Sequence, residues 1–371
     1  MTDHSDFLAA IIDRPDDDLP RLVYADFLEE SGDEMRAEFI RVHCELERLP
    51  ADDGARPALL KRGLELFIYR GAWIIPGMTA TKQHFRRGFV ESMETTAESV
   101  VEFANVIFTT TPLRHLRAIN SDGPVDRFVR IENLARLVSL DVSNGSSSTV
   151  SQIVHEASLT NLRRLAVRNC RIWSEGLVAI SQSAVIERLA ALDLAGNPLA
   201  DEGMETIAHN SNFSGLTSLI LRGDDQAEER CIHAEGAQSL ANSRTLTNLE
   251  ILDLSGNYLG DTGLFNLSTA TNFARVRDLN LADNELGQSG NDAYTALLRS
   301  PHWVNLQRLN LSKNQIEALL VPTLQEWIRA RSGRILDLRN LRYSAETQRL
   351  LLSAPEATSM ILDMDFDEET I

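Results

Sequence analysis

The chain has 371 residues, 43% hydrophobic content and a net charge of −18, so it can bury a sizeable core and lacks the basic balance that nucleic-acid phosphates demand. The acidity is concentrated at the two ends: residues 1–35 carry eleven acids against two arginines, and residues 355–371 carry six acids without Lys or Arg. No signal peptide, membrane-spanning stretch or disulfide spacing is visible, so we expect a soluble cytoplasmic protein.

Residues 5–49 predict three short amphipathic helices. Pro20 suits the first turn of the second helix, Gly32 can end it, and Asp33 can cap the third. The string RPDDDLPRLVYADFLEESGDEMRAEFIRVHCELERL resembles the repeat-companion domain, a short bacterial module found ahead of leucine-rich or similar repeats. Phe27 stands where that family has Trp and His43 where Gln is commoner, which puts any role of that Trp in doubt. The resemblance implies no biochemical activity.

Polar residues within this match allow two interpretations. Asp26 can pair with Arg36 or Arg41 inside the helix bundle, or these side chains, together with Tyr24, can form a docking surface. Residues 56–90 carry seven Lys or Arg against one acid, so this segment is expected to bind the acidic residues 1–35, the acidic head, within the same chain.

The rest of the chain is dominated by a repeat. Leu189, Leu192, Leu194, Asn197 and Leu199 follow the spacing L-x-x-L-x-L-x-x-N-x-L. Similar copies begin at Leu162, with Cys170 in the Asn slot, and at Leu249, Val276 and Leu306, and weaker copies begin at Leu113, Leu137, Leu216 and Leu336. Alternate residues of a strand face opposite sides, so the leucines are expected to form a core between stacked repeats while the x residues face solvent.

A glycine lies six residues after the Asn slot in several copies and is followed by apolar residues at helical spacing. Repeats of roughly 27 residues with a helical return resemble the ribonuclease-inhibitor-like class of leucine-rich repeats. We therefore expect an α/β solenoid, a horseshoe of about nine repeats with a parallel sheet inside and helices outside, behind a small all-α module. A strand at 89–93 and residues 322–328 with 361–364 are expected to cap its two ends.

The predicted domains are a helical repeat-companion module at 1–50, a helical linker and N-terminal cap at 51–112, the repeats at 113–341, and a C-terminal cap with an acidic tail at 342–371. The tail residues Asp363, Asp365 and Asp367 lack the Gly and distal Glu of a calcium loop.

The sequence carries no phosphate-binding loop, nucleophile elbow or metal-ligand motif, so we predict a protein without catalysis, cofactor or metal. One enzymatic alternative stays open, because repeats of this class also build GTPase-activating proteins. Arg114 or Arg117 would then be the arginine that acts on a bound GTPase. A structural spacer with no guest is a third possibility.

Binding of a protein partner by a monomer, without nucleic acid or membrane, is the favoured function. The candidate residues on the concave face are the strand x positions Arg164, Arg168, Asp193, Arg222, Asp253, Asp278, Asn280, Arg308 and Asn310. A second candidate is an insertion of about six residues after one strand, where insertions often map to a binding rim. Its acids, which suit a basic partner, are Asp224, Asp225, Glu228 and Glu229. A solvated sheet or a merely tolerated loop are the alternatives.

Overall fold

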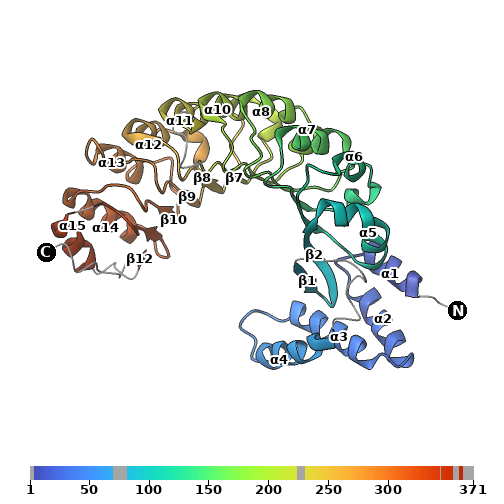
Figure 1. Ribbon diagram of the computed structural model, residues 1–371. Helices are drawn as coiled ribbons and strands as arrows, with labels where there is room; N and C mark the ends of the chain where they lie inside the picture. Colours follow the sequence, from blue (N-terminus) through green and yellow to red (C-terminus); the bar gives the residue numbers. More distant parts are fainter. Residues whose placement is uncertain (1–3, 70–81, 224–229, 343, 354–358, 362–371) are drawn as a thin grey trace. The chain divides into compact units, whose positions relative to one another are not determined.

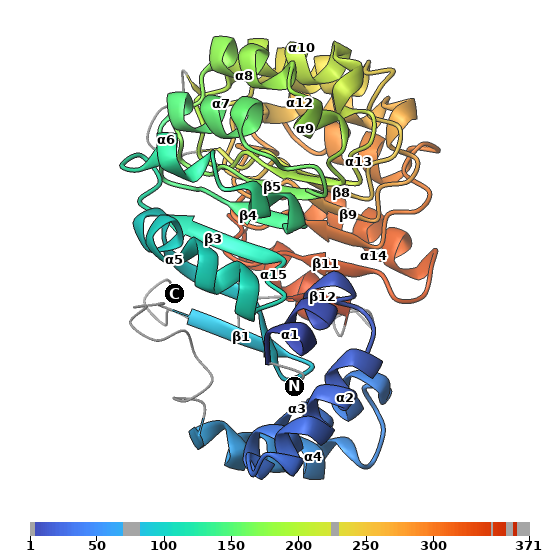
Figure 2. The ribbon, with the colours of Figure 1, turned by 90° about the vertical axis from the view of Figure 1, so that its right-hand side faces the viewer.

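The computed structural model describes residues 4–69, 82–223, 230–342, 344–353 and 359–361 (Figures 1 and 2). Contacts divide the chain into two compact units. We call residues 1–142 with 156–162 the N-terminal unit, and residues 143–155 with 163–371 the repeat unit. Each unit is described by itself.

The N-terminal unit begins with the three predicted helices, α1 (His4–Asp13), α2 (Leu19–Glu30) and α3 (Glu34–Arg48). Pro20 occupies the first turn of α2, and the Asp33 side chain accepts a hydrogen bond from the Arg36 amide at the start of α3, as predicted. Ile11 and Ile40 are fully buried between these helices. The three helices predicted within residues 5–49 are therefore confirmed.

A small sheet follows in the same unit. Its further elements are α4 (Arg56–Phe67), β1 (Lys82–Arg86), β2 (Phe89–Thr96), α5 (Ala97–Thr110), β3 (His115–Ile119), α6 (Val125–Phe128), the 3-10 helix η2 (Glu132–Arg136) and β4 (Ser139–Asp141). Strand β1 pairs antiparallel with β2, while β2, β3 and β4 run parallel. The strand predicted at 89–93 lies within β2, and its antiparallel partner β1 was not foreseen.

Ion pairs join the acidic helices to the basic segment behind them. Arg87 contacts Asp18 at 3.1 Å and Arg86 pairs with Glu47. Arg62 on α4 holds the Glu38 carboxylate of α3 with two hydrogen bonds of 2.6 Å. The predicted intramolecular seat for the acidic head is thus present within this unit.

One ion pair of this unit is buried. Arg21 on α2 donates to Glu91 on β2 at 2.9 Å, with side-chain exposures of 0% and 3%. Burial raises the pKa of Glu91 and lowers that of Arg21, because each charge has left water. The Arg36 guanidinium also lies 4.8 Å from the ring centroid of Phe89. These contacts attach β2 to the helices.

The repeat unit is a parallel sheet with helices on one side. Its strands are β5 (Arg164–Ala166), β6 (Ala191–Asp193), β7 (Ser218–Ile220), β8 (Ile251–Asp253), β9 (Asp278–Asn280), β10 (Arg308–Asn310), β11 (Ile335–Asp337) and β12 (Met360–Ile361), each paired with the next. The middle residues of β5 to β11 are leucines in register, and all are buried. In Figure 1 the strands line the inner side of this unit and the helices its outer side. The predicted α/β solenoid is confirmed.

Helical segments connect these strands. They are α7 (Ser147–Glu156), α8 (Ser174–Ser181), α9 (Ala184–Glu187), α10 (Ala200–His209), η3 (Ser211–Phe213), α11 (Ala234–Ala241), α12 (Gly260–Ser268), η5 (Thr271–Phe273), α13 (Asp292–Leu298), η6 (Ala318–Leu320), α14 (Val321–Arg329) and α15 (Ala345–Leu352). The repeat glycine lies in the first turn of several of them. A Cβ at Gly236 of α11 would lie 2.4 Å from Asp201 Oδ1, so only glycine permits this close approach.

The Asn slot is a buried bridge between successive repeats. Asn197 donates from Nδ2 to the carbonyls of Val167 and Leu194, and its Oδ1 accepts from the amides of Cys170 and Ile172. Each of these backbone groups would otherwise be unpaired where the chain leaves the strand. The same arrangement recurs at Asn314, and at Asn257 with one amide donor, that of Ile232.

The C-terminal end of the repeat unit has the predicted apolar cover. Leu324, Trp327 and Ile328 of α14 are buried, and the Arg334 guanidinium lies 4.3 Å from the Trp327 ring centroid. Strand β12, which pairs with β11, overlaps the strand expected at 361–364 at Ile361, and 362–364 lie outside the described residues. The acidic tail, 362–371, lies outside the described residues.

Candidate functional site: the inner face of the repeat unit

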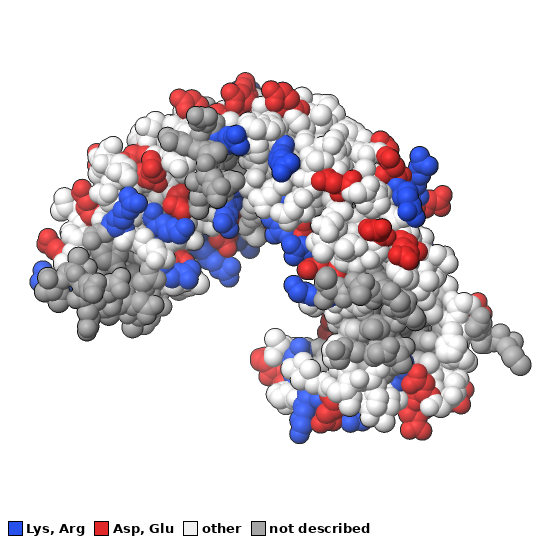
Figure 3. Space-filling view, viewed as in Figure 1, with Lys and Arg blue, Asp and Glu red and all other residues white. Residues whose placement is uncertain are grey.

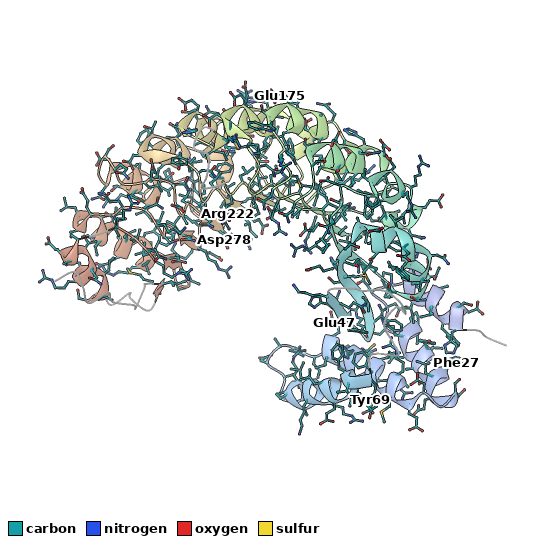
Figure 4. All side chains as sticks on the ribbon, in the orientation of Figure 1. Phe27, Glu47, Tyr69, Glu175, Arg222 and Asp278 are labelled. Carbon is teal, nitrogen blue, oxygen red and sulfur yellow. The ribbon has the colours of Figure 1, made fainter. Side chains whose placement is uncertain are left out.

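The nine predicted contact residues come from consecutive strands of the repeat unit and the residues just after them. The register aligns Asp193 with Ile220, Asp253, Asn280 and Asn310 in one row across the sheet. In Figure 4, Arg222 and Asp278 lie on the inner edge of this unit, whereas Glu175 lies on its outer edge. The structure therefore brings the predicted residues together on one face.

Four residues of that row also shape the strand ends. The Oδ1 atoms of Asp193, Asp253, Asn280 and Asn310 each accept a hydrogen bond from the amide two residues later, at 2.9 to 3.1 Å. A short Asx side chain satisfies the backbone amide that follows each strand. Sequence reasoning assigned these residues to binding and missed this structural role.

The remaining polar atoms of the row pair with neighbouring strands. Asn280 Nδ2 donates to Asp253 Oδ2 at 3.1 Å. Arg168 lies 3.5 Å from Asp193, and its Nε donates to Ser143 Oγ. These polar groups are therefore partly occupied within the repeat unit.

Another ion pair lies across two of these strands. Arg308 contacts Asp278 at 3.4 Å, with the Arg308 side chain 67% exposed. An ion pair this exposed contributes little to stability, so both side chains stay available to a partner.

Two of the predicted arginines differ from the others. Arg164 and Arg222 are exposed and form no ion pair or side-chain hydrogen bond with any other residue that the structure describes. Arg277, which directly precedes β9, is also exposed and forms none. Figure 3 shows Lys and Arg along the inner edge of the repeat unit and Asp and Glu mainly along its outer edge. Ile251 and Ile335, 42% and 39% exposed, add apolar surface at the strand starts.

The strand-to-helix rim holds aromatic residues that sequence reasoning missed. Trp173 is 47% exposed, and the Arg230 guanidinium lies 5.0 Å from its ring centroid. His233 and Tyr258 stack at 6.0 Å with an interplanar angle of 26°. A departure from the residue type of neighbouring repeats is the signal that could have revealed them. The predicted rim acids Asp224, Asp225, Glu228 and Glu229 lie outside the described residues.

The arginines of the enzymatic alternative are held by carboxylates of the N-terminal unit. Arg114 contacts Asp16 at 2.7 Å, and Arg117 contacts Glu94 at 3.2 Å and Asp141 at 3.4 Å. An arginine that acts on a bound GTPase must reach outward, and these contacts oppose that reach.

Two further kinds of chemistry, by a cysteine thiolate and by a bound metal ion, have little support among the described residues. The three cysteines are buried and unbridged, and burial raises the pKa of Cys44 to about 12, which opposes thiolate formation. Among the described residues, no three His, Cys, Asp or Glu side chains are placed to hold a metal ion. No described helix is both long and apolar enough to cross a membrane.

Family models agree with this geometry. One model described as Leucine Rich repeat matches residues 158–181, 189–208 and 245–268, and a second, Leucine Rich Repeat, matches 305–327. The chain contains leucine-rich repeats. They account for the buried leucine register and for the Asn bridge between neighbouring strands.

Two curated proteins are similar to this chain in sequence. A mouse protein named NACHT, LRR and PYD domains-containing protein 14 is 29% identical over 41% of this chain and 16% of its own length. The pig ribonuclease inhibitor is 26% identical over 64% of this chain and 60% of its own length. The chain thus spans less than two thirds of the length of either relative.

Solved structures with partial similarity include a TLR13–ssRNA13 complex, with a TM-score of 0.40, 18% identity, and coverage of 75% of this chain and 38% of that one. An internalin (inlF) from Listeria monocytogenes has a TM-score of 0.30, 16% identity and coverage of 75% and 87%. The mouse RP105/MD-1 complex has a TM-score of 0.34, 16% identity and coverage of 74% and 50%.

Proposed function

We propose that the chain is a non-enzymatic scaffold or adaptor that binds a protein partner on the inner face of the repeat unit. The observation that carries this proposal is the pair of exposed arginines, Arg164 and Arg222, on a face where several Asp and Asn side chains bond within the unit. Arginine is enriched among residues that dominate binding energy. A sheet held by buried leucines and Asn bridges presents these side chains with little loss of backbone freedom.

The finer assignments form part of the same proposal. The repeats belong to the ribonuclease-inhibitor-like class, with residues 113–341 as the repeat domain and 342–371 as its cap and tail. Residues 1–50 are a repeat-companion module of bacterial type, and 51–112 link it to the repeats. The protein acts in the cytoplasm as a monomer, without cofactor, nucleic acid or membrane.

Two other functions have less support. A GTPase-activating role needs an arginine free to enter a partner's site, whereas Arg114 and Arg117 pair with carboxylates of their own unit. A spacer that binds no partner would not require exposed, unpaired arginines on the inner face. Other polar residues could replace them there without the loss of a contact.

The test is affinity capture from native lysate with the double variant Arg164→Glu/Arg222→Glu. This pair spares Arg168, which bonds to Ser143 and Asp193. The matched control is Arg188→Glu/Arg244→Glu, because both arginines are exposed and lie outside the strands. We expect the inner-face variant to lose roughly tenfold or more in affinity for the captured protein, and the control to retain it.

Circular dichroism should show that both double variants fold like the wild type. Capture that is equal in the two variants would exclude the inner face as the binding surface. Failure of the wild type to retain any protein would favour the spacer.

A further inference from the structure

The rim of the repeat unit has one position that differs sharply between repeats. The third residue after the Asn slot is small and takes a left-handed φ in three repeats, at Ala200 (51°), Gly260 (57°) and Gly287 (83°). In two others the backbone is extended, at Trp173 (φ −84°) and Glu317 (φ −104°), and His233 (φ −109°), which precedes α11 beyond the insertion, is extended as well. The extended conformation directs a large side chain out of the turn in place of a small one.

No helix-capping bond explains a tryptophan at position 173. It is 47% exposed and occupies the N-cap of α8 without a side-chain capping bond. Ser, Thr, Asp or Asn at this position would accept a backbone hydrogen bond that Trp leaves unmade. An exposed indole at a cap position therefore lowers stability, and binding is the physical role that fits it.

Arg230 completes this surface from a different repeat. Its guanidinium lies over the Trp173 ring, with 5.0 Å to the centroid. The side chain is exposed and makes no ion pair or hydrogen bond with the rest of the described chain. Arg171, two residues before Trp173, is also exposed and makes none. The indole is therefore accompanied by two cations.

One acid of this rim, Asp201, already bonds within the fold. Asp201 Oδ1 accepts from the amides of His233 at 2.8 Å and Gly236 at 2.9 Å, and its Oδ2 lies 3.9 Å from the His233 ring. His233 in turn stacks on Tyr258. The aromatic pair enlarges this surface. Asp201 stabilises the turn that carries His233.

We propose that this rim patch, defined as Arg171, Trp173, Arg230, His233 and Tyr258, binds an acidic peptide segment of a partner protein. Carboxylates of the segment pair with the two guanidiniums, and an adjacent apolar side chain packs against the indole. A basic segment would meet like charges here. The proposal rests on the chain being a protein-binding scaffold, but it uses a surface separate from the inner-face arginines.

The experiment is selection of a random dodecapeptide display library on the full chain, followed by binding measurements with fluorescein-labelled copies of the enriched peptides. The test variants are Trp173→Ser and Arg230→Glu. Val178→Ser is the control for the first, because Val178 is also 47% exposed, and Arg188→Glu is the charge-matched control for the second.

Enriched peptides should combine Asp or Glu with a large apolar residue. Each test variant should weaken their binding roughly tenfold or more, while the controls stay within about twofold of wild type. Circular dichroism should show that Trp173→Ser folds like the wild type, because Ser can make the N-cap bond that Trp leaves unmade and so offset part of the lost packing. Loss of binding then cannot come from misfolding.

Three results would overturn the proposal: no enrichment, enrichment of basic peptides, or equal binding to test and control variants. The inner-face variant Arg164→Glu/Arg222→Glu separates the two proposals. If it alone abolishes peptide binding, the rim proposal fails and the inner face stands. If only the rim variants do so, the rim proposal stands and the inner face is not the peptide site.

Discussion

Asp253 illustrates how one side chain serves both the fold and the surface. Its Oδ1 accepts from the amide and the hydroxyl of Ser255, and its Oδ2 accepts from Asn280. A partner that used this carboxylate would compete with those bonds. Exposed arginines such as Arg222 have no such commitment to described residues. For this reason we place the binding energy of the inner face on arginine rather than on the aspartates.

His43 supplies a prediction about pH. Burial lowers the pKa of His43 from 6.5 to about 4, and the nearby positive charge of Arg36 contributes to the shift. The folded N-terminal unit therefore binds fewer protons than the unfolded chain between these values. The stability that neutral His43 contributes is present above pH 6.5 and is lost as the pH falls through about 4, at roughly 1.4 kcal/mol per pH unit within that window.

The variant His43→Gln should reduce this pH dependence, because Gln cannot titrate. The measurement is hydrogen exchange of α3 amides at neutral pH and near pH 5, compared between the two proteins. His302→Gln in the repeat unit is the control and should leave exchange in α3 unchanged. Identical pH dependence in wild type and His43→Gln would contradict the assignment.

At the scale of elements, the turn after each strand is the unit of construction. Asn314 donates to the carbonyls of Leu281 and Leu311 and accepts from the amides of Asn284 and Leu286. These four backbone groups belong to two successive repeats. The loss of one side chain therefore weakens the junction between repeats as well as a single turn.

We predict that Asn314→Ala destabilises the repeat unit by roughly 2–4 kcal/mol, since an orphaned buried polar group costs about 1–3 kcal/mol and water can satisfy some of the four. Urea unfolding followed by far-ultraviolet circular dichroism measures the loss. Asn242→Ala, at an exposed site after α11, should change the free energy of unfolding by about 0.5 kcal/mol or less. Equal effects at the two sites would show that the Asn bridge contributes little.

At the scale of the whole molecule, the two units are stabilised differently. The repeat unit has a continuous core of leucines in register, with Asn bridges between repeats. The N-terminal unit adds partly exposed ion pairs between its acidic helices and basic residues further along the chain, including Arg62–Glu38, Arg86–Glu47 and Arg114–Asp16. Exposed ion pairs are screened by salt, whereas apolar contacts are not.

Raising sodium chloride from about 0.1 M to about 1 M should therefore lower amide protection in α2 and α3 more than in α10 to α12. The expected loss of opening free energy in α2 and α3 is roughly 1 kcal/mol, because each exposed pair contributes little alone and the pairs form a network. Hydrogen exchange with mass spectrometry reads both regions in the same sample. An equal change in both regions would show that these ion pairs do not hold the acidic helices α2 and α3 in place.

The sequence by itself determined the repeats, the strand positions, the Asn slot and the three N-terminal helices. Each follows from local periodicity, and one period repeated many times leaves one way to bury the leucines. The charge contrast between residues 1–35 and 56–90 likewise anticipated the seat of the head. The antiparallel strand β1 was not anticipated, since its pairing with β2 depends on a turn between them and on packing from the helices.

Only the tertiary structure decided which surface side chains remain available. Asp253 and Asn280 satisfy each other because their strands are neighbours in register, and no pattern within one repeat shows that pairing. Arg230 reaches Trp173 because turns of different repeats lie along the same rim. Periodicity specifies the leucine core, but the contacts made by an exposed side chain depend on neighbours that the fold brings to it from distant parts of the sequence.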